Sequence, residues 1–223
     1  MKIFKPKFWN KKNSLISFIL LPLTIFIQIL ISVQKRMTII KKISIPVICV
    51  GNIYLGGTGK TPLSIEIATV LKKFNKKTAI IKKSYVEHSD EFGLIESRGV
   101  ALFKNLSRIK AISSAIENNF NCVVLDDGLQ DFSINKNISI VCFNEKQLWG
   151  NGMTFPSGPL REPLSSLKRC QIVVINGSKN FEFERKIQNI SKDISIYYSK
   201  YLPINLEDFR NQNLLAFAGI GNP

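Results

Sequence analysis

Residues 56–62 of the chain read Gly-Gly-Thr-Gly-Lys-Thr-Pro and directly follow the apolar run at residues 45–50. Glycines let successive backbone N–H groups turn toward one anion, and the start of the following helix adds partial positive charge. In that arrangement Lys60 can reach the β- and γ-phosphates of ATP, and the Thr61 hydroxyl can ligate Mg²⁺. The sequence therefore predicts a phosphate-binding loop, whose expected nucleotide-binding residues are Tyr54, Leu55, Gly56, Gly57, Thr58, Gly59, Lys60 and Thr61.

The loop departs from the common pattern G-x-x-x-x-G-K-[ST] at one position. The first glycine of the pattern would fall at residue 54, which is Tyr54, whereas glycines stand at Gly51, Gly56 and Gly57. A glycine-rich turn with an incidental lysine is the alternative. Phosphate binding is favoured because an apolar strand precedes the loop and an amphipathic stretch at residues 63–74 follows it, which is the context that the motif requires.

A second candidate site directly follows the apolar run at residues 122–125. It reads Asp-Asp-Gly-Leu-Gln at residues 126–130. Enzymes with a phosphate-binding loop place the carboxylate that holds Mg²⁺, directly or through water, at the end of such a strand. Thr61, Asp126 and Asp127 are therefore the predicted metal ligands. Gln130 either orients a group near the γ-phosphate or makes hydrogen bonds within the turn, and the sequence leaves both roles open.

A long loop rich in glycine and proline occupies residues 150–163 and ends in Arg161 and Glu162. Such a loop is suited to presenting a guanidinium group to a phosphate. Composition alone is equally consistent with a surface connection. The sequence therefore offers Arg161 as a candidate phosphate contact, with the surface connection as the alternative.

The elements that must position these residues alternate between short apolar runs and helix-like stretches. Near-continuous runs of valine, isoleucine and cysteine predict strands buried on both faces, hence a mostly parallel sheet flanked by helices, the α/β class of the P-loop NTPases. Strands are predicted at residues 47–50, 78–81, 100–103, 122–125, 138–143, 172–175, 194–198 and 214–218. Helices are predicted from residue 62, from about residue 91, and at residues 109–117 and 181–190.

Residues 14–33 form an apolar segment without a charged side chain, and basic residues flank it on both sides. A helix of this length just spans a bilayer core of about 30 Å. A helix lying in the membrane interface and a buried helix of a soluble protein are the alternatives. We expect residues 1–42 to form a membrane-associated helix, with Phe8 and Trp9 at the interface, and residues 43–223 to form the domain that carries the site.

The composition indicates either an anionic partner or a contribution to solubility, because 31 lysine and arginine residues against 16 aspartate and glutamate residues give a net charge of +15. The basic residues are scattered and form no recognition-helix pattern, so an anionic membrane surface is favoured over nucleic acid. No Cys-x-x-Cys pair occurs among the four cysteines, which predicts buried reduced thiols. The single histidine, His88, fits a solvated loop.

Taken together, these motifs resemble the tetraacyldisaccharide 4′-kinases of lipid A biosynthesis. The resemblance rests on Gly-Gly-Thr-Gly-Lys-Thr-Pro at 56–62, Leu-Asp-Asp-Gly-Leu-Gln at 125–130, Pro-Ser-Gly-Pro-Leu-Arg-Glu-Pro at 156–163 and Gly-Ile-Gly-Asn-Pro at 219–223. It implies an enzyme at the cytoplasmic face of the bacterial inner membrane. That enzyme transfers the γ-phosphate of ATP, with Mg²⁺, to the 4′-hydroxyl of a lipid A disaccharide 1-phosphate. No protein partner is predicted.

The resemblance also implies roles that the motifs alone do not assign. In the family an Asp-Glu pair after the second strand supplies a catalytic aspartate, and Asp90 with Glu91 matches that place. Asp90 is then the base that activates the sugar hydroxyl, whereas without the resemblance an N-cap role is equally expected. The expected catalytic residues are Asp90 and Lys60, and the expected substrate-binding residues are Glu91, Gln130, Arg161 and Glu162.

The chain departs from the family at three places. The family's Ser-Arg-Gly-Tyr stretch reads Lys-Lys-Ser-Tyr at residues 82–85, and Asp131 stands where the family has histidine. The chain also stops at Pro223, before a segment with Asp-His-His whose histidine assists the aspartate. We therefore expect a fragment or a shortened, inactive relative, with the C-terminal part of the family fold missing. The alternatives to a kinase are a membrane-recruited ATPase switch and an inactive scaffold.

Overall fold

The structure of the protein is a computed structural model that describes residues 5–84 and 89–202. The strands are β1 (Val47–Gly51), β2 (Thr78–Lys83), β3 (Ala101–Asn105), β4 (Cys122–Asp126), β5 (Ile138–Asn144), β6 (Ile172–Asn176) and β7 (Ser195–Ser199). The α-helices are α1 (Leu15–Ile19), α2 (Leu21–Met37), α3 (Lys60–Lys73), α4 (Ser89–Ser97), α5 (Arg108–Glu117) and α6 (Phe181–Ile190). Two 3₁₀-helices, η1 (Lys7–Asn10) and η2 (Leu164–Arg169), complete the described elements.

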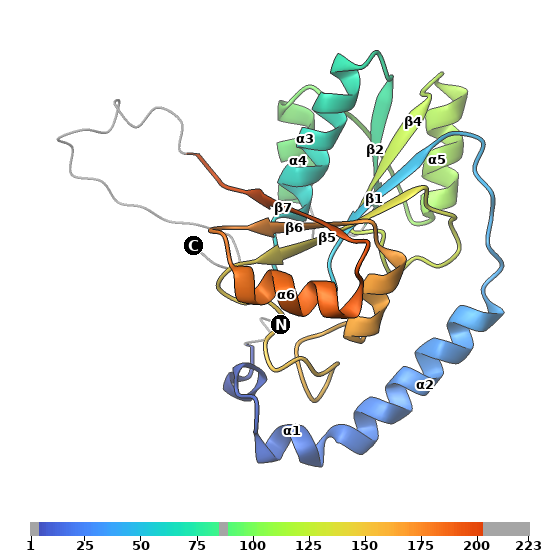
Figure 1. The fold of residues 1–223 in the computed structure, drawn as a ribbon. Coiled ribbons are helices and arrows are strands. Elements are labelled where there is room, and N and C mark those ends of the chain that lie inside the picture. Colours follow the sequence, from blue (N-terminus) through green and yellow to red (C-terminus); the bar gives the residue numbers. More distant parts are fainter. Residues whose placement is uncertain (1–4, 85–88, 203–223) are drawn as a thin grey trace.

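The strands form one seven-stranded sheet in the order β3-β2-β4-β1-β5-β6-β7 (Figure 1). All neighbouring strands in it are parallel. The chain turns from β1 into the phosphate-binding loop, and β4 is the immediate neighbour of β1. Because parallel strands all end at the same edge, the loop and the acidic end of β4 lie side by side, at the edge where α/β proteins bind ligands.

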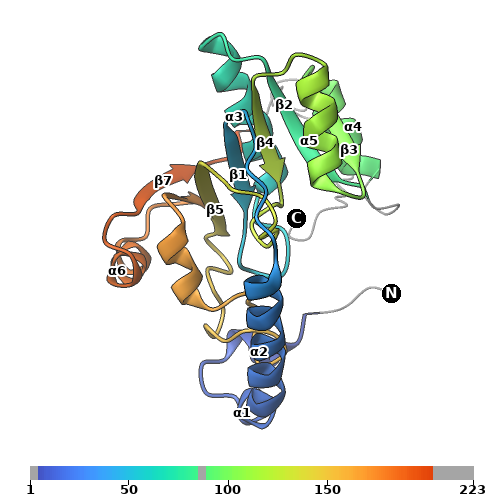
Figure 2. The same cartoon turned by 90° about the vertical axis from the view of Figure 1, so that its right-hand side faces the viewer.

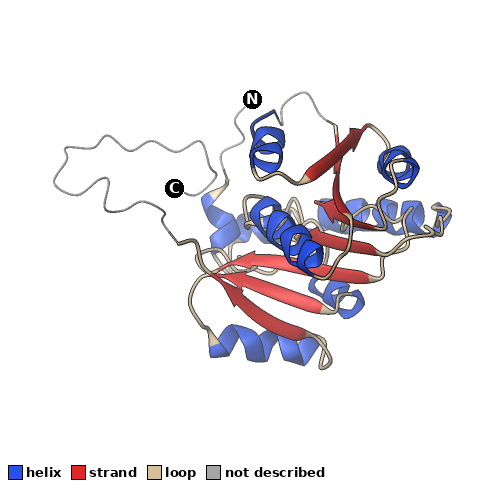
Figure 3. Cartoon of the chain, turned by 90° about the horizontal axis from the view of Figure 1, so that it is seen from above, coloured by secondary structure: helices blue, strands red, loops and turns tan. Residues whose placement is uncertain are grey.

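Helices cover both faces of the sheet (Figure 3). Side chains alternate between the two faces of each strand, and the buried ones fall into two clusters. One cluster joins the sheet to α3 and α4 through Ile65, Ala68 and Ile95. The other joins it to α5 and α6 through Ile112 and Phe183. Because the strands are buried on both faces, they appear in the sequence as continuous apolar runs.

The predicted α/β fold with a mostly parallel sheet is confirmed. Helix α3 begins at Lys60, earlier than the predicted start at Pro62, because Gly59 already serves as its N-cap. The four cysteines are all buried and free, as predicted. The strand predicted at 214–218, the stretch 219–223 and His88 lie outside the described residues.

The apolar N-terminal segment forms two helices, α1 and α2, where the sequence predicted one. The break falls at Leu20, and Pro22 stands in the first turn of α2, where its missing N–H is tolerated. Within the residues described, no helix combines the length and the apolar character that crossing a bilayer requires. Figure 2 shows both helices at the same end of the molecule, below the sheet.

Trp9 contradicts one expectation, because it is buried rather than placed at a membrane interface. Only 5% of the residue is exposed, and its Nε1 donates a hydrogen bond to the carbonyl oxygen of Pro156 at 3.1 Å. The hydroxyls of Thr24 in α2 and Ser157 share a second hydrogen bond of 2.7 Å. The N-terminal segment is thus attached to the long loop, and its division from the rest of the chain at residue 42 stays a prediction.

Candidate active site

The phosphate-binding loop connects the end of β1 to the first turn of α3. Gly59 has a φ of 86°, in the left-handed region that favours glycine, and forms the N-cap of the helix. The side chain of Asn52 braces the loop, since its Nδ2 donates to the carbonyl oxygen of Gly56 at 3.0 Å and to the Thr58 hydroxyl at 3.1 Å. The loop is therefore held in shape at a helix N-terminus, which is the arrangement that binds phosphate.

Asp126 ends β4 directly beside this loop. The register of the two strands pairs it with Val50 of β1, and its carboxylate is 0% exposed. Its Oδ2 accepts a hydrogen bond from the Thr61 hydroxyl at 2.9 Å, and its Oδ1 accepts one from Ser64 at 3.2 Å. The structure thus brings together Thr61 and Asp126, two of the three predicted metal ligands. A hydroxyl and a carboxylate are hard oxygen ligands and fit Mg²⁺.

Asp127, the third predicted ligand, makes its contacts with cationic side chains. Its Oδ1 accepts a hydrogen bond from Nη1 of Arg161 at 3.0 Å and lies 3.9 Å from Nζ of Lys60. Burial alone would raise the pKa of Asp127, but Lys60 and Arg161 outweigh burial and hold the pKa below its ordinary value. Asp127 is therefore ionised at neutral pH and positions both cations beside the phosphate-binding loop.

The long loop at residues 150–163 packs against the site instead of forming a plain surface connection. The backbone N–H of Arg161 donates to the carbonyl oxygen of Ile53 at 2.7 Å. Gln130 contacts both residues that end the loop: its Nε2 donates to Oε1 of Glu162 at 2.9 Å, and its Oε1 accepts from Nη1 of Arg161 at 3.3 Å. Of the two roles left open for Gln130, the structure favours hydrogen bonding within the loops.

Tyr54, which occupies the off-pattern position, is 1% exposed. Its backbone forms an antiparallel bridge with Leu160, and the ammonium of Lys5 lies 5.0 Å from the centroid of its ring. The ring belongs to the hydrophobic core, so the bulky residue is accommodated without entering the phosphate-binding loop. A contact between Tyr54 and a nucleotide would therefore come from its backbone.

The expected catalytic aspartate lies at the start of α4. The side chain of Asp90 lies outside what the structure describes, so its role stays a prediction. Its neighbour Glu91 forms an ion pair with Nζ of Lys82, which also pairs with Asp126. This contact connects α4 to the edge of the sheet that carries the metal ligands.

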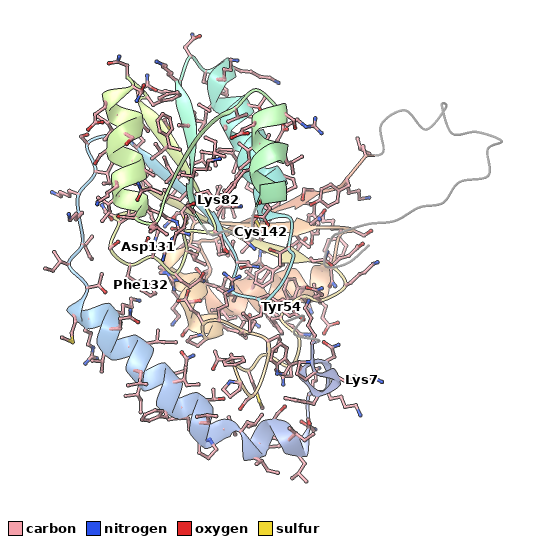
Figure 4. The ribbon with its side chains drawn as sticks, turned by 180° about the vertical axis from the view of Figure 1, so that it is seen from behind. Lys7, Tyr54, Lys82, Asp131, Phe132 and Cys142 are labelled. Carbon is pink, nitrogen blue, oxygen red and sulfur yellow. The ribbon has the colours of Figure 1, made fainter. Side chains whose placement is uncertain are left out.

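Lys82 belongs to the site although its sequence context gave it no role. The register of β2 with β4 pairs Ile81 with Leu125, so the next residues, Lys82 and Asp126, lie beside each other. The side chain of Lys82 lies within the molecule, beside the sheet (Figure 4), and is 7% exposed. Its Nζ lies 3.3 Å from Oγ1 of Thr61. Burial alone would lower the pKa of Lys82, but the nearby carboxylates outweigh burial and raise it.

A sequence signal for Lys82 did exist, because a lysine directly follows the apolar residues 79–81 of a strand buried on both faces. Arg108 offered no such signal. It stands at the start of α5, and its guanidinium donates to the carbonyl oxygen of Asp127 at 2.7 Å and to Oδ2 of Asp131 at 3.2 Å. Only the tertiary fold brings Arg108 to the site.

We expect Asp131→Asn to weaken folding in a pH-dependent way. Burial alone would raise the pKa of Asp131, but Ser133 and Arg108 lower it in the folded protein. A carboxyl whose pKa is lowered by folding stabilises the protein above its unfolded pKa of about 3.9, and that stability is lost as the pH falls. The substitution should lower the free energy of unfolding by about 1–2 kcal/mol at pH 7.

Urea unfolding at pH 7 and at successively lower pH measures this difference, which should shrink below about pH 4 as the wild-type carboxyl takes up its proton. The exposed Asp193 supplies the matched control, since Asp193→Asn removes the same charge and Asp193 forms no ion pair with any other residue that the structure describes. A loss that is equal at pH 7 and pH 3 would show that folding does not lower the pKa of Asp131.

Comparisons with known proteins agree on one family. The tetraacyldisaccharide-1-P 4′-kinase family matches residues 16–223. A tetraacyldisaccharide 4′-kinase of Pelagibacter ubique is 44% identical, over 100% of this chain and 71% of that protein. One of Rickettsia canadensis is 33% identical, over 100% of this chain and 72% of its own length.

Among solved structures, LpxK of Aquifex aeolicus in complex with ATP superposes with a TM-score of 0.63 at 20% identity. The superposition covers 90% of this chain and 86% of that one. At this identity, the likeness shows a shared fold.

Proposed function

This chain belongs to the tetraacyldisaccharide-1-P 4′-kinase family, and on that premise we propose that it transfers the γ-phosphate of ATP to the 4′-hydroxyl of a tetraacyldisaccharide 1-phosphate in lipid A biosynthesis. Thr61 and Asp126 hold Mg²⁺, directly or through water, and Lys60 with the loop N–H groups holds the phosphates. Bound Mg²⁺ supplies neutralisation of the phosphate charge. Asp90 accepts the proton of the sugar hydroxyl.

The observation that carries this proposal is a polar cavity of about 560 Å³ between the candidate nucleotide site and α2. Its lining includes Arg108, Asp127, Gln130, Asp131, Arg161 and Glu162, together with Ile31 and Gln34 of α2 and Thr38, which follows that helix directly. Asp127 also pairs with Lys60 of the phosphate-binding loop. A phosphorylated sugar in this cavity lies between the nucleotide on one side and an apolar helix on the other, as an acylated acceptor requires.

The exposed surface of α1 and α2 supports a membrane-bound acceptor. Large apolar side chains that are at least half exposed there include Leu15, Ile16, Ile19, Ile25, Phe26, Ile29 and Leu30. Exposed apolar patches of this kind mark protein or membrane contacts. We propose that both helices lie in the interface at the cytoplasmic face of the inner membrane, with the basic residues on anionic lipid.

An apolar cavity of about 590 Å³ beside α2 extends this argument to the acyl chains. Its lining includes Leu21, Ile25 and Ile29 from the helix, and Met153 and Leu164 from the opposite side. An acyl chain of the acceptor fits such a surface, because burying each methylene group contributes about 0.8 kcal/mol.

Labelled phosphate distinguishes the kinase from the ATPase switch. We expect label from [γ-³²P]ATP to appear in the lipid when tetraacyldisaccharide 1-phosphate is supplied in mixed micelles with Mg²⁺. An acceptor that lacks the 4′-hydroxyl is the matched control and should receive no label. The Pelagibacter ubique relative is the positive control, which shows whether the assay conditions support transfer.

Label that reaches only inorganic phosphate, while the relative labels the lipid, would support a switch. No label in either product would support an inactive scaffold.

A further inference from the structure

A lysine ammonium lies among the groups expected to hold Mg²⁺. Nζ of Lys82 pairs with Oδ2 of Asp126 and lies 3.3 Å from Oγ1 of Thr61. Those same two oxygens are 2.9 Å apart and joined by a hydrogen bond. Glu91 of α4 completes the surroundings of the ammonium with a second carboxylate. One positive charge therefore contacts two of the three predicted protein ligands of the metal, Thr61 and Asp126.

The position follows from the electrostatics of a buried carboxylate. Asp126 is 0% exposed, and a buried charge without a compensating charge is strongly unfavourable. Thr61 and Ser64 donate hydrogen bonds to Asp126 but carry no charge. Lys82 supplies the missing positive charge, and its side chain is itself 7% exposed.

The same position conflicts with a metal ion. Mg²⁺ binds oxygen ligands at about 2.1 Å, so an ion held directly by Thr61 and Asp126 would lie against both oxygens that the ammonium now contacts. Like charges this close repel strongly where water is excluded. Lys82 and Mg²⁺ therefore compete for one pair of ligands.

We propose that Lys82 is an internal cation that occupies the Mg²⁺ ligands of the nucleotide-free protein and that must leave Asp126 before the metal can bind. This inference rests on the proposed Mg²⁺·ATP site. The negative charge of ATP attracts the Lys82 ammonium and Mg²⁺ alike. We therefore expect metal and nucleotide to bind together. When the metal binds, Lys82 keeps Glu91 as its partner, which links the metal site to α4, the helix that also carries Asp90.

Binding of Mn²⁺, used as a probe for Mg²⁺, tests this role without any activity measurement. Electron paramagnetic resonance of free Mn²⁺ gives the affinity of the protein for the metal alone and with a non-hydrolysable ATP analogue. We expect Lys82→Met and Lys82→Gln to bind Mn²⁺ alone about tenfold more tightly than the wild type, or tighter still, because a competing charge is removed. Lys82→Gln retains a hydrogen-bond donor to Asp126, so it allows the measurement if Lys82→Met does not fold.

Two controls make the result specific to the charge at this position. Lys82→Arg keeps the cation and should bind Mn²⁺ as weakly as the wild type. Lys104 is the register partner of Lys82 on β3 and pairs with Glu96 of the same helix α4, but its side chain is 47% exposed. Lys104→Met should therefore leave the Mn²⁺ affinity unchanged.

The outcomes separate this inference from the proposed function. A folded Lys82→Gln protein that binds Mn²⁺ within twofold of the wild type would overturn the competition and make Lys82 a fixed counter-charge of Asp126. Equally tight binding by Lys82→Gln and Lys82→Arg would also overturn it. If neither wild type nor variants bound Mn²⁺ with the ATP analogue present, the proposed Mg²⁺·ATP site itself would be wrong.

Discussion

Replacing Lys60 by alanine is expected to lower kcat/KM for phosphate transfer by about 10³-fold, because a preorganised positive charge beside the transferred phosphate is lost. The fold should survive the change. Among the described residues the one ion-pair partner of Lys60 is Asp127, 3.9 Å away, and so long a contact contributes at most about 1 kcal/mol to folding. Steady-state kinetics and urea unfolding of the same preparation measure both quantities.

Lys73 provides the matched control for this prediction. It is an exposed lysine in the last turn of the same helix, α3, far from the loop. Lys73→Ala should leave kcat/KM within about twofold, since only a weak interaction with the helix dipole is removed. If Lys60→Ala retained more than a tenth of the wild-type kcat/KM, the loop would not hold the reacting phosphate.

Asp126→Asn should affect folding as well as transfer. The amide can still accept a hydrogen bond from Thr61, but Lys82 loses the buried carboxylate that compensates its charge. Removing one partner of a buried pair costs about 3–5 kcal/mol of the free energy of unfolding. We expect about 3 kcal/mol, because Glu91 still pairs with Lys82. Transfer should fall by about 10²-fold or more with the loss of a metal ligand.

The double variant Asp126→Asn/Lys82→Met separates these two effects. It removes both buried charges, so at least half of the lost free energy of unfolding should return, while transfer should stay low. Urea unfolding of both single variants and the double variant gives the coupling energy between the two residues. A coupling energy near zero would show that the pair of Lys82 and Asp126 does not stabilise the fold.

The sheet and the phosphate-binding loop were predictable because local sequence determines both. Continuous apolar runs predicted the strands. The glycines before Lys60, placed between a strand and a helix, predicted the phosphate-binding loop. Asp126 was predicted as a metal ligand because enzymes with a phosphate-binding loop place a carboxylate at the end of such a strand, and the pairing of β1 with β4 brings it beside Thr61. The family resemblance drawn from these motifs is confirmed by the matches over the whole chain.

The remaining features of the site depend on contacts between distant parts of the chain. The position of Lys82 against Asp126 requires the order of β2 and β4 in the sheet, which no local pattern contains. Arg108 reaches Asp127 only because the start of α5 lies beside the loop that follows β4. The burial of Trp9 was missed for the same reason, since the long loop holds the N-terminal segment in place. The break at Leu20 had a local signal in Pro22.

Transfer of phosphate to one particular hydroxyl can be read from the structure of the lipid product. A ³¹P–¹H correlation spectrum of the lipid recovered after incubation with Mg²⁺ and ATP identifies the sugar carbon that carries the new phosphate. We predict a second phosphorus resonance that correlates with the 4′ proton of the disaccharide, absent from the Lys60→Ala reaction. A new phosphate at another carbon, or an unchanged 1-phosphate lipid while the longer relative forms product, would overturn the proposed function.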